Sequence, residues 1–312
     1  MRLIYMGTPE FSVSFLRHLV DSEHEVVAVV TQPDRPAGRG RHLQPSPVKS
    51  AALELGIAVL QPDSLKDPAF EAEIRSLQAD LSVVVAFSIL PKSILAATRM
   101  GAVNLHGSLL PRYRGAAPVQ WAVANGDHKT GLSVFLLDEK MDHGPLLVQE
   151  RLAIGSQDTG IDVLQNMIPL GCSALDRALA GLALGNIQPL PQDHAAACPA
   201  PKLRKEDGQI DWTQSAQRIH DRIRGFHPWP GGFSSLRGKM LHFHKTLPLI
   251  SHDSLRPGEV SVLPGKRIVV GTGEGALELL VVQAEGKKPL SAAEFLNGIH
   301  EPHDLNFERN SQ

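Results

Sequence analysis

A polar amide and an imidazole close an apolar run in the segment "GAVNLHGSLLPRYRGAAP", residues 101–118. In an extended strand, Asn104 and His106 share one face because side chains two residues apart point the same way. An amide can hydrogen-bond to an oxyanion, and an imidazole can carry a proton at neutral pH. The pair therefore predicts acyl-transfer chemistry at the end of this strand.

Acyl transfer by this pair also needs a carboxylate that holds the charge of the imidazole. Asp142, in "KMDHGP", is the best candidate because it follows an apolar run and precedes the turn formers Gly144 and Pro145. Each of the three side chains also has a structural explanation, as a satisfied polar group at a strand end or as a turn residue. Ser108 does not indicate a serine hydrolase, because no G-x-S-x-G motif surrounds it. Chemistry alone leaves acyl transfer plausible and no more.

Alternating strand and helix patterns are expected to position these residues. Apolar runs predict strands, and amphipathic stretches between them predict helices, which is the pattern of a Rossmann-like, doubly wound, mainly parallel α/β sheet. In such sheets ligands bind at the carboxyl ends of the strands, where Asn104 and His106 lie. The expected strands are residues 2–7, 25–32, 57–62, 81–88, 101–106, 131–139 and 145–154, and the expected helices include 67–79, 116–125 and 158–184.

The composition changes near residue 186, where prolines become frequent and periodicity is lost. We therefore expect a catalytic domain at 1–188, a linker at 189–206 and a second domain at 207–312. The last segment has short apolar runs separated by glycine and proline, which predict a smaller C-terminal β-barrel of the OB-like kind.

Composition excludes several functional classes. The net charge is −2 and 21% of residues are charged, so any contact with nucleic acid must depend on local basic patches. The two cysteines, without a CxxC spacing, are typical of reduced thiols in the cytoplasm. No apolar run is long enough to span a bilayer. The pairs His242/His244 and His300/His303 predict no metal site, because no third ligand stands at a suitable spacing. The first turn lacks G-x-G-x-x-G, which argues against a nicotinamide or flavin.

Five stretches resemble the folate-dependent formyltransferases, in particular those that act on methionyl-tRNA. The stretches are "MGTPEF", "TQPDRPAGRGRHLQPSPVK", "NLHGSLLPRYRGAAP", "MDHGP" and "IDWTQSAQRIHDRIRGFHPWPGGFS". They follow one another in order along nearly the whole chain, so the resemblance is far more specific than a single glycine motif. The family pattern usually has a small residue where His143 stands, and we expect this substitution to be tolerated.

The resemblance implies a reaction and a set of residues. The formyl group of 10-formyltetrahydrofolate would pass to the amino group of methionine esterified to initiator tRNA. Asn104, His106 and Asp142 would form the catalytic trio. The folate co-substrate would contact Ser108, Leu109, Leu110 and Pro111, and an apolar slot for it would include Val85, Phe87 and Ile89.

The resemblance further implies that the loop at 33–49 enters the acceptor end of the tRNA, with Arg39 at the position of the family's key arginine. Arginine suits phosphates and base edges because its guanidinium is a planar fork. The loop residues expected to contact tRNA are Arg35, Arg39, Arg41 and Lys49, and those of the second domain are Lys205, Arg237 and Lys245. From charge alone, a solvated, semi-rigid surface loop is the better explanation of residues 33–49.

Two other functions remain open at this point. A formyltransferase acting on an amino sugar nucleotide would carry the same trio and would differ in the 33–49 loop and in the region around residues 210–234. A tRNA-binding protein without catalytic activity could keep the fold, although an intact trio argues against it. We expect a cytoplasmic monomer.

Overall fold

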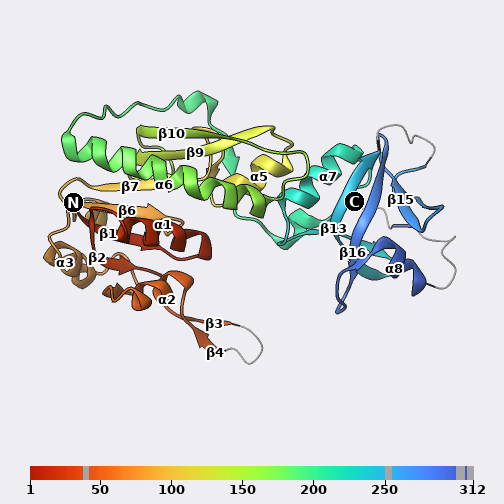
Figure 1. Ribbon diagram of the computed structural model, residues 1–312, viewed down its shortest axis with the longest axis horizontal. Coiled ribbons are helices and arrows are strands. Elements are labelled where there is room, and N and C mark those ends of the chain that lie inside the picture. The colour runs from red at the N-terminus through yellow and green to blue at the C-terminus, as the bar shows by residue number, and fades with distance from the viewer. Residues whose placement is uncertain (38–41, 250–254, 300–305, 308–312) are drawn as a thin grey trace. The chain divides into compact units, whose positions relative to one another are not determined.

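The computed structural model describes residues 1–37, 42–249, 255–299 and 306–307. The chain folds into two compact units (Figure 1). The first comprises residues 1–118, 130–152 and 164–201, and the second comprises residues 119–129, 153–163 and 202–312. The chain therefore passes from one unit to the other several times.

A seven-stranded sheet with the order β10-β9-β7-β6-β1-β2-β5 forms the centre of the first unit. The five neighbouring strands β7, β6, β1, β2 and β5 pair in parallel, and β9 pairs antiparallel with β7. This mainly parallel sheet confirms the α/β class predicted from the alternating patterns. The bounds are β1 Arg2–Gly7, β2 Glu25–Val30, β5 Val59–Leu60, β6 Leu81–Val85, β7 Ala102–His106, β9 Lys129–Leu136 and β10 Leu146–Ala153.

Helices cover both faces of this sheet. On one face, α3 and α4 form a buried cluster with Ile4 and Val84 of the sheet. On the other face α6 packs closely on α1 and β7, because a Cβ at Gly171 would lie 2.6 Å from the Phe15 ring and 3.2 Å from Leu105. The helices of the first unit are α1 Glu10–Val20, α2 Pro47–Glu54, α3 Pro68–Ser76, α4 Lys92–Leu95 and most of α6 Gly160–Leu184. Helix α5 Pro118–Ala124 falls almost entirely in the second unit.

Helix α6 is long and apolar enough to cross a membrane by length and composition, which the sequence pattern did not indicate. One side of it is nevertheless part of the core: Met167, Leu175 and Leu179 are fully buried. A long core helix meets the same length requirement as a membrane span, and a third of the apolar stretch of α6 (33%) is buried inside the protein.

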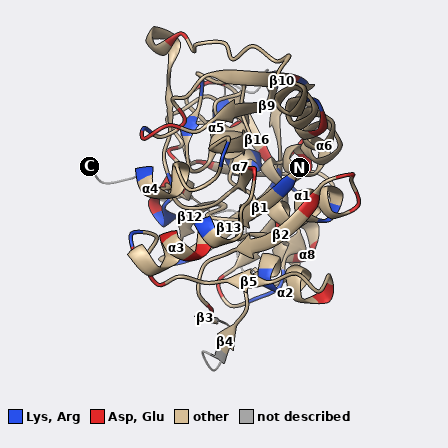
Figure 2. Cartoon of the chain, turned by 90° about the vertical axis from the view of Figure 1, so that its left-hand side faces the viewer, with Lys and Arg blue, Asp and Glu red and all other residues tan. Residues whose placement is uncertain are grey.

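The loop predicted at residues 33–49 contains regular structure. A short hairpin forms between β3 (Arg35–Ala37) and β4 (His42–Gln44), and it projects from the sheet in both views (Figures 1 and 2). Ser46 then caps α2 by accepting a hydrogen bond from the Lys49 N–H at 3.0 Å. The face seen in Figure 2 mixes basic and acidic residues over α1, α2 and α3.

The second unit contains a separate antiparallel sheet of six strands, ordered β12-β13-β16-β15-β14 with β17 paired to β16. Short apolar runs separated by glycine and proline predicted such strands. The elements are α7 Ala216–Gly225, β12 Gly232–Leu236, β13 Lys239–Leu249, β14 Val260–Leu263, β15 Arg267–Gly271, β16 Ala276–Ala284, β17 Leu290–Ser291 and α8 Ala292–Asn297.

Aromatic side chains build the core of this second unit. Trp212 is buried and its ring stacks on Phe307 with centroids 4.9 Å apart, while Phe243 meets it edge-on at 5.7 Å. The indole N–H of Trp212 donates to Ser234 Oγ at 3.1 Å, so its one polar atom is satisfied inside the core.

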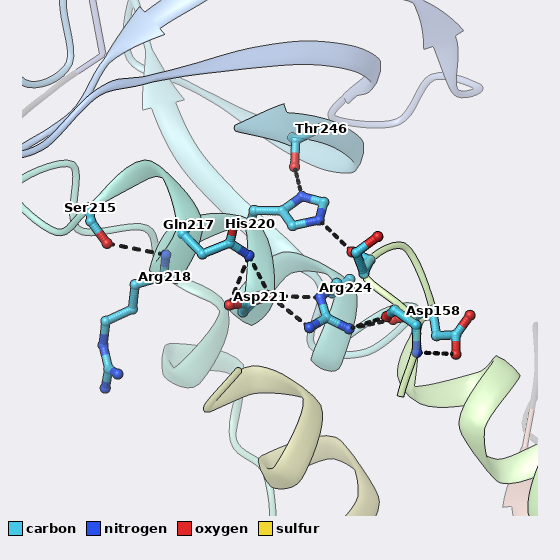
Figure 3. Close-up of polar contacts among 10 residues, drawn as sticks. Asp158, Ser215, Gln217, Arg218, His220, Asp221, Arg224 and Thr246 are labelled. Carbon is cyan, nitrogen blue, oxygen red and sulfur yellow. Dashed lines mark hydrogen bonds and ion pairs between the residues drawn. The ribbon is translucent and has the colours of Figure 1, made fainter. Parts of the chain in front are cut away.

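A buried polar cluster on α7 holds the turn at residues 155–158 within the second unit (Figure 3). Arg224 forms an ion pair with Asp221 at 2.7 Å, and both side chains are less than a tenth exposed. Arg224 also donates to the carbonyl of Asp158 at 2.9 Å. The ring of His220 donates to the carbonyl of Ser156 at 3.2 Å and accepts from the Thr246 hydroxyl at 3.0 Å, and burial lowers its pKa, so the ring is neutral at neutral pH.

Replacing Arg224 with methionine should destabilise the protein by about 3–5 kcal/mol, because it leaves the Asp221 carboxylate buried without its cation. Chemical denaturation monitored by circular dichroism measures this loss. Arg218→Met is the matched control, since Arg218 lies on the same helix, is exposed and points away from the cluster in Figure 3. Equal stability of the two variants would show that the buried pair does not stabilise this unit.

Candidate active site

Strand β7 places Asn104 and His106 on one face of the sheet. Ala102, two residues before Asn104, belongs to the buried cluster under α3 and α4, whereas Leu105 faces α6. In the register with β9, Asn104 lies opposite Phe135 and His106 opposite Ser133. The alternation predicted from the sequence is therefore present in the strand.

The imidazole of His106 is buried and fixed in one tautomer. Its exposed fraction is 6%, and its Nε2 lies 2.9 Å from the carbonyl oxygen of Tyr113. A carbonyl only accepts hydrogen bonds, so Nε2 carries the proton. Nδ1 is then the atom that can take up a further proton, and it lies 3.7 Å from Oδ2 of Asp142.

Asp142 lies in the loop between β9 and β10 and reaches His106 from a distant part of the sequence. Its side chain is 9% exposed, and the carboxylate accepts the N–H of Gly115 at 2.8 Å. Its backbone is in the left-handed region, with a φ of 51°, which is uncommon for a residue with a Cβ and is often found at functional sites. The loop also needs Gly144, because a Cβ there would lie 1.8 Å from the carbonyl oxygen of Leu136.

The side chain of Asn104 has an unsatisfied polar atom at this site. Its Oδ1 is buried and has no hydrogen-bond partner among the described residues. Buried amides are nearly always paired, so an unpaired one needs an explanation such as a bound ligand. Oδ1 only accepts hydrogen bonds, so a ligand group that pairs with it has to be a donor, whereas an oxyanion would pair with the amide Nδ2–H. The arrangement thus joins an amide with an unpaired acceptor, an imidazole that can accept a proton and a carboxylate that can stabilise the resulting charge.

The segment predicted to contact folate, residues 108–111, continues directly from this strand. Ser133 organises it: its hydroxyl donates to the Ser108 carbonyl at 2.7 Å and accepts the Leu110 N–H at 3.1 Å. Gln149 donates to the Leu110 carbonyl at 2.9 Å, and the Leu110–Pro111 peptide is cis. Ser108 and Leu110 are buried, whereas Leu109 and Pro111 are half-buried.

The three residues predicted for the apolar slot differ in exposure. Val85 is fully buried at the end of β6, Phe87 is half-buried and Ile89 is 66% exposed. Ile89 lines a cavity of about 630 Å³ at the carboxyl ends of β2, β5 and β6. Lys66 and Lys92 also line this cavity, and Lys92 forms an ion pair with Glu139 at 2.8 Å.

The residues predicted to contact tRNA lie apart from the trio in the sequence and are only partly described. Arg35 is exposed and donates to the Gln32 side chain at 3.2 Å, and Lys49 forms an ion pair with Asp34 at 2.7 Å. Arg39 and Arg41 lie outside the described residues. In the second unit, the three predicted cations Lys205, Arg237 and Lys245 are all exposed.

Several supporting groups of the site had no recognisable signal in the sequence. The Tyr113 carbonyl and the Gly115 N–H are backbone atoms, which every residue type offers. The short strand β8 (Arg114–Gly115) pairs in parallel with β11 (Pro199–Ala200), so the segment predicted as a linker runs beside these groups. No cluster of three or more metal-ligating side chains occurs among the residues with described positions.

Comparison with known proteins agrees with this geometry. The formyl transferase domain matches residues 1–179, and the C-terminal domain of formyl transferases matches residues 202–300. The chain belongs to the formyl transferase family. The trio of this formyltransferase therefore lies within the part matched by the first domain, and the antiparallel sheet lies within the part matched by the second.

Curated relatives extend the match over the whole formyltransferase. The chain is 43% identical over 299 residues to the methionyl-tRNA formyltransferase of Solibacter usitatus, with 96% of each chain covered. It is 44% identical over 299 residues to the enzyme of the same name from Geobacter metallireducens, again with 96% of each covered.

A solved structure shares the fold at low sequence identity. The N-formyltransferase from Helicobacter canadensis, in complex with folinic acid and dTDP-3-aminofucose, aligns with a TM-score of 0.68 and 16% identity. The alignment covers 90% of this chain and 98% of that one. At this identity the likeness supports the fold of the formyltransferase and does not distinguish between acceptors.

Proposed function

We propose that this chain transfers the formyl group of 10-formyltetrahydrofolate to the amino group of methionyl initiator tRNA and so forms N-formylmethionyl-tRNA for translation initiation. The observation that carries the proposal is the match over 96% of the chain with enzymes named methionyl-tRNA formyltransferase. The buried His106–Asp142 pair beside Asn104 supplies groups suited to that reaction.

The residues divide the work of the transfer as follows. The Nδ2–H of Asn104 donates a hydrogen bond to the formyl oxygen, which becomes an oxyanion when the methionine nitrogen attacks the formyl carbon. His106 accepts the proton of the attacking amine on Nδ1, and Asp142 stabilises the imidazolium that results. His106 then returns the proton to N10 of the folate as the bond between N10 and the formyl carbon breaks. The products are tetrahydrofolate and the formylated amine.

A binding place for the folate co-substrate is part of the proposal. We assign it to segment 108–111 together with the cavity lined by Ile89. Folates carry glutamate carboxylates, and Lys66 would give that cavity a cation to receive them, whereas Lys92 is already paired with Glu139. No metal takes part in this proposal, because the protonation steps are assigned to His106 and Asp142.

Contact with tRNA is assigned to the 33–49 loop and to exposed cations of the second unit. Arg35, Arg39, Arg41 and Lys49 would meet the acceptor end, and Lys205, Arg237 and Lys245 would contact phosphates. We also propose that the six-stranded sheet closes as a small OB-like barrel, and that the enzyme acts as a cytoplasmic monomer.

Substitution of the trio should abolish most formyl transfer without unfolding the protein. His106→Ala, Asp142→Asn and Asn104→Ala should each lower kcat by about 10²–10⁴-fold, because each removes a proton carrier, its counter-charge or an oxyanion donor. The assay follows formyl transfer from 10-formyltetrahydrofolate to methionyl-tRNA. His18→Ala, a histidine on the surface of α1, should retain wild-type kcat.

The same assay separates this function from its alternative. A dTDP-linked amino sugar offered in place of methionyl-tRNA should not be formylated. Formylation of the sugar nucleotide without formylation of methionyl-tRNA would overturn the proposal, and full activity of His106→Ala would exclude that residue from the chemistry.

Arg39→Ala should raise KM for methionyl-tRNA about tenfold or more and leave KM for the folate unchanged, because the loop is assigned to the acceptor end alone. The variant should also show a weaker dependence of binding on salt. Arg75→Ala, on the exposed side of α3, is the control. An equal rise in KM for methionyl-tRNA and for the folate would mean that the loop supports the fold and does not contact the tRNA.

A further inference from the structure

Gln192 is a buried side chain in the segment predicted as a linker. It is 6% exposed. Its amide nitrogen donates to the backbone carbonyl of Asp142 at 3.1 Å and to that of Gly144 at 2.7 Å. Both hydrogens of the amide are therefore used on the loop that carries the catalytic carboxylate, on either side of His143.

The amide oxygen of Gln192 is linked to the same carboxylate through two consecutive residues, Arg114 and Gly115. Its Oε1 accepts a hydrogen bond from the guanidinium of Arg114 at 2.6 Å. The next residue, Gly115, donates its N–H to Oδ2 of Asp142 at 2.8 Å. Gly115 of β8 thus holds the side chain of Asp142 directly, and its neighbour Arg114 reaches the backbone of Asp142 through Gln192.

Further contacts fix the same stretch of chain against the Asp142 loop. Leu190 and Leu146 exchange two backbone hydrogen bonds of 2.8 Å each. The rings of His194 and His143 stack with centroids 3.8 Å apart and planes 10° from parallel. Gln192 lies between these two contacts in the sequence, so its amide is held in place from both sides.

We propose that Gln192 is a positioning residue for Asp142. Asp142 adopts a left-handed backbone conformation that a residue with a side chain seldom adopts without support, and the two carbonyls that Gln192 binds lie in that turn. Its role is to keep Oδ2 of Asp142 at 3.7 Å from Nδ1 of His106. This inference rests on the proposed formyl transfer, in which the distance between Asp142 and His106 determines how strongly the carboxylate stabilises the imidazolium.

A positioning role predicts a specific kinetic pattern. Gln192 binds only protein groups in the contacts above, so its loss should leave binding of both substrates intact. The misplaced carboxylate should slow the chemical step, and small displacements of reacting groups lower rates by roughly tenfold to a hundredfold. The effect should vanish when Asp142 can no longer act, because the two residues serve one function.

The test uses Gln192→Met, which keeps the length of the side chain and removes its polar atoms, and Gln192→Glu, which keeps an acceptor for Arg114 but cannot donate to the two carbonyls. Gln188→Met is the matched control, since Gln188 is an exposed glutamine just before this segment. We expect both Gln192 variants to lower kcat about tenfold or more with each KM changed less than about threefold. In an Asp142→Asn background, Gln192→Met should cause no further loss.

Three results would each overturn the inference. The first is a wild-type kcat in both Gln192 variants, and the second is a lower kcat accompanied by a rise in both KM values. The third is that Gln192→Met lowers kcat in the Asp142→Asn background as much as it does in the wild type. A crystal structure of Gln192→Met gives a readout that does not depend on the reaction: the separation of Asp142 and His106 should depart from that in the wild type. An unchanged separation would refute positioning by Gln192 even if methionyl-tRNA proved not to be the acceptor.

Discussion

The approach of two buried ionisable groups, His106 and Asp142, is the constraint on which the first unit depends. Their facing atoms are 3.7 Å apart and both side chains are less than a tenth exposed. Burying such groups is costly unless hydrogen bonds compensate them. The Tyr113 carbonyl and the Gly115 N–H provide that compensation, so the turn after β7 serves the imidazole and the carboxylate at once.

This arrangement explains why distant parts of the chain converge at one edge of the sheet. β7 supplies the imidazole, the loop after β9 supplies the carboxylate and the segment before β11 holds that loop through Gln192. Antiparallel pairing ends β9 beside Val103, near the start of β7, so the loop after β9 has to run back along that strand for Asp142 to reach His106. A segment rich in proline, which composition alone marks as a linker, therefore takes part in building the site.

The parts predicted from the sequence are those that depend on side-chain pattern. Apolar runs located the strands, and the period of two placed Asn104 and His106 on one face. The supporting contacts could not be predicted, because they involve backbone atoms of Tyr113 and Gly115 and a lone glutamine whose burial depends on tertiary packing. The same limit applies to the 33–49 loop, where pairing across the β3–β4 hairpin gives order that proline and charge content do not indicate.

The central claim is that His106 and Asp142 act as one unit in formyl transfer. A double-mutant cycle of His106→Ala and Asp142→Asn, measured by single-turnover formylation of methionyl-tRNA, tests it most directly. The account predicts that the double variant is as slow as His106→Ala alone, because Asp142 serves only to stabilise the charge on the ring. The account would be contradicted if the rate loss of the double variant equalled the product of the two single-variant losses, since the residues would then contribute independently.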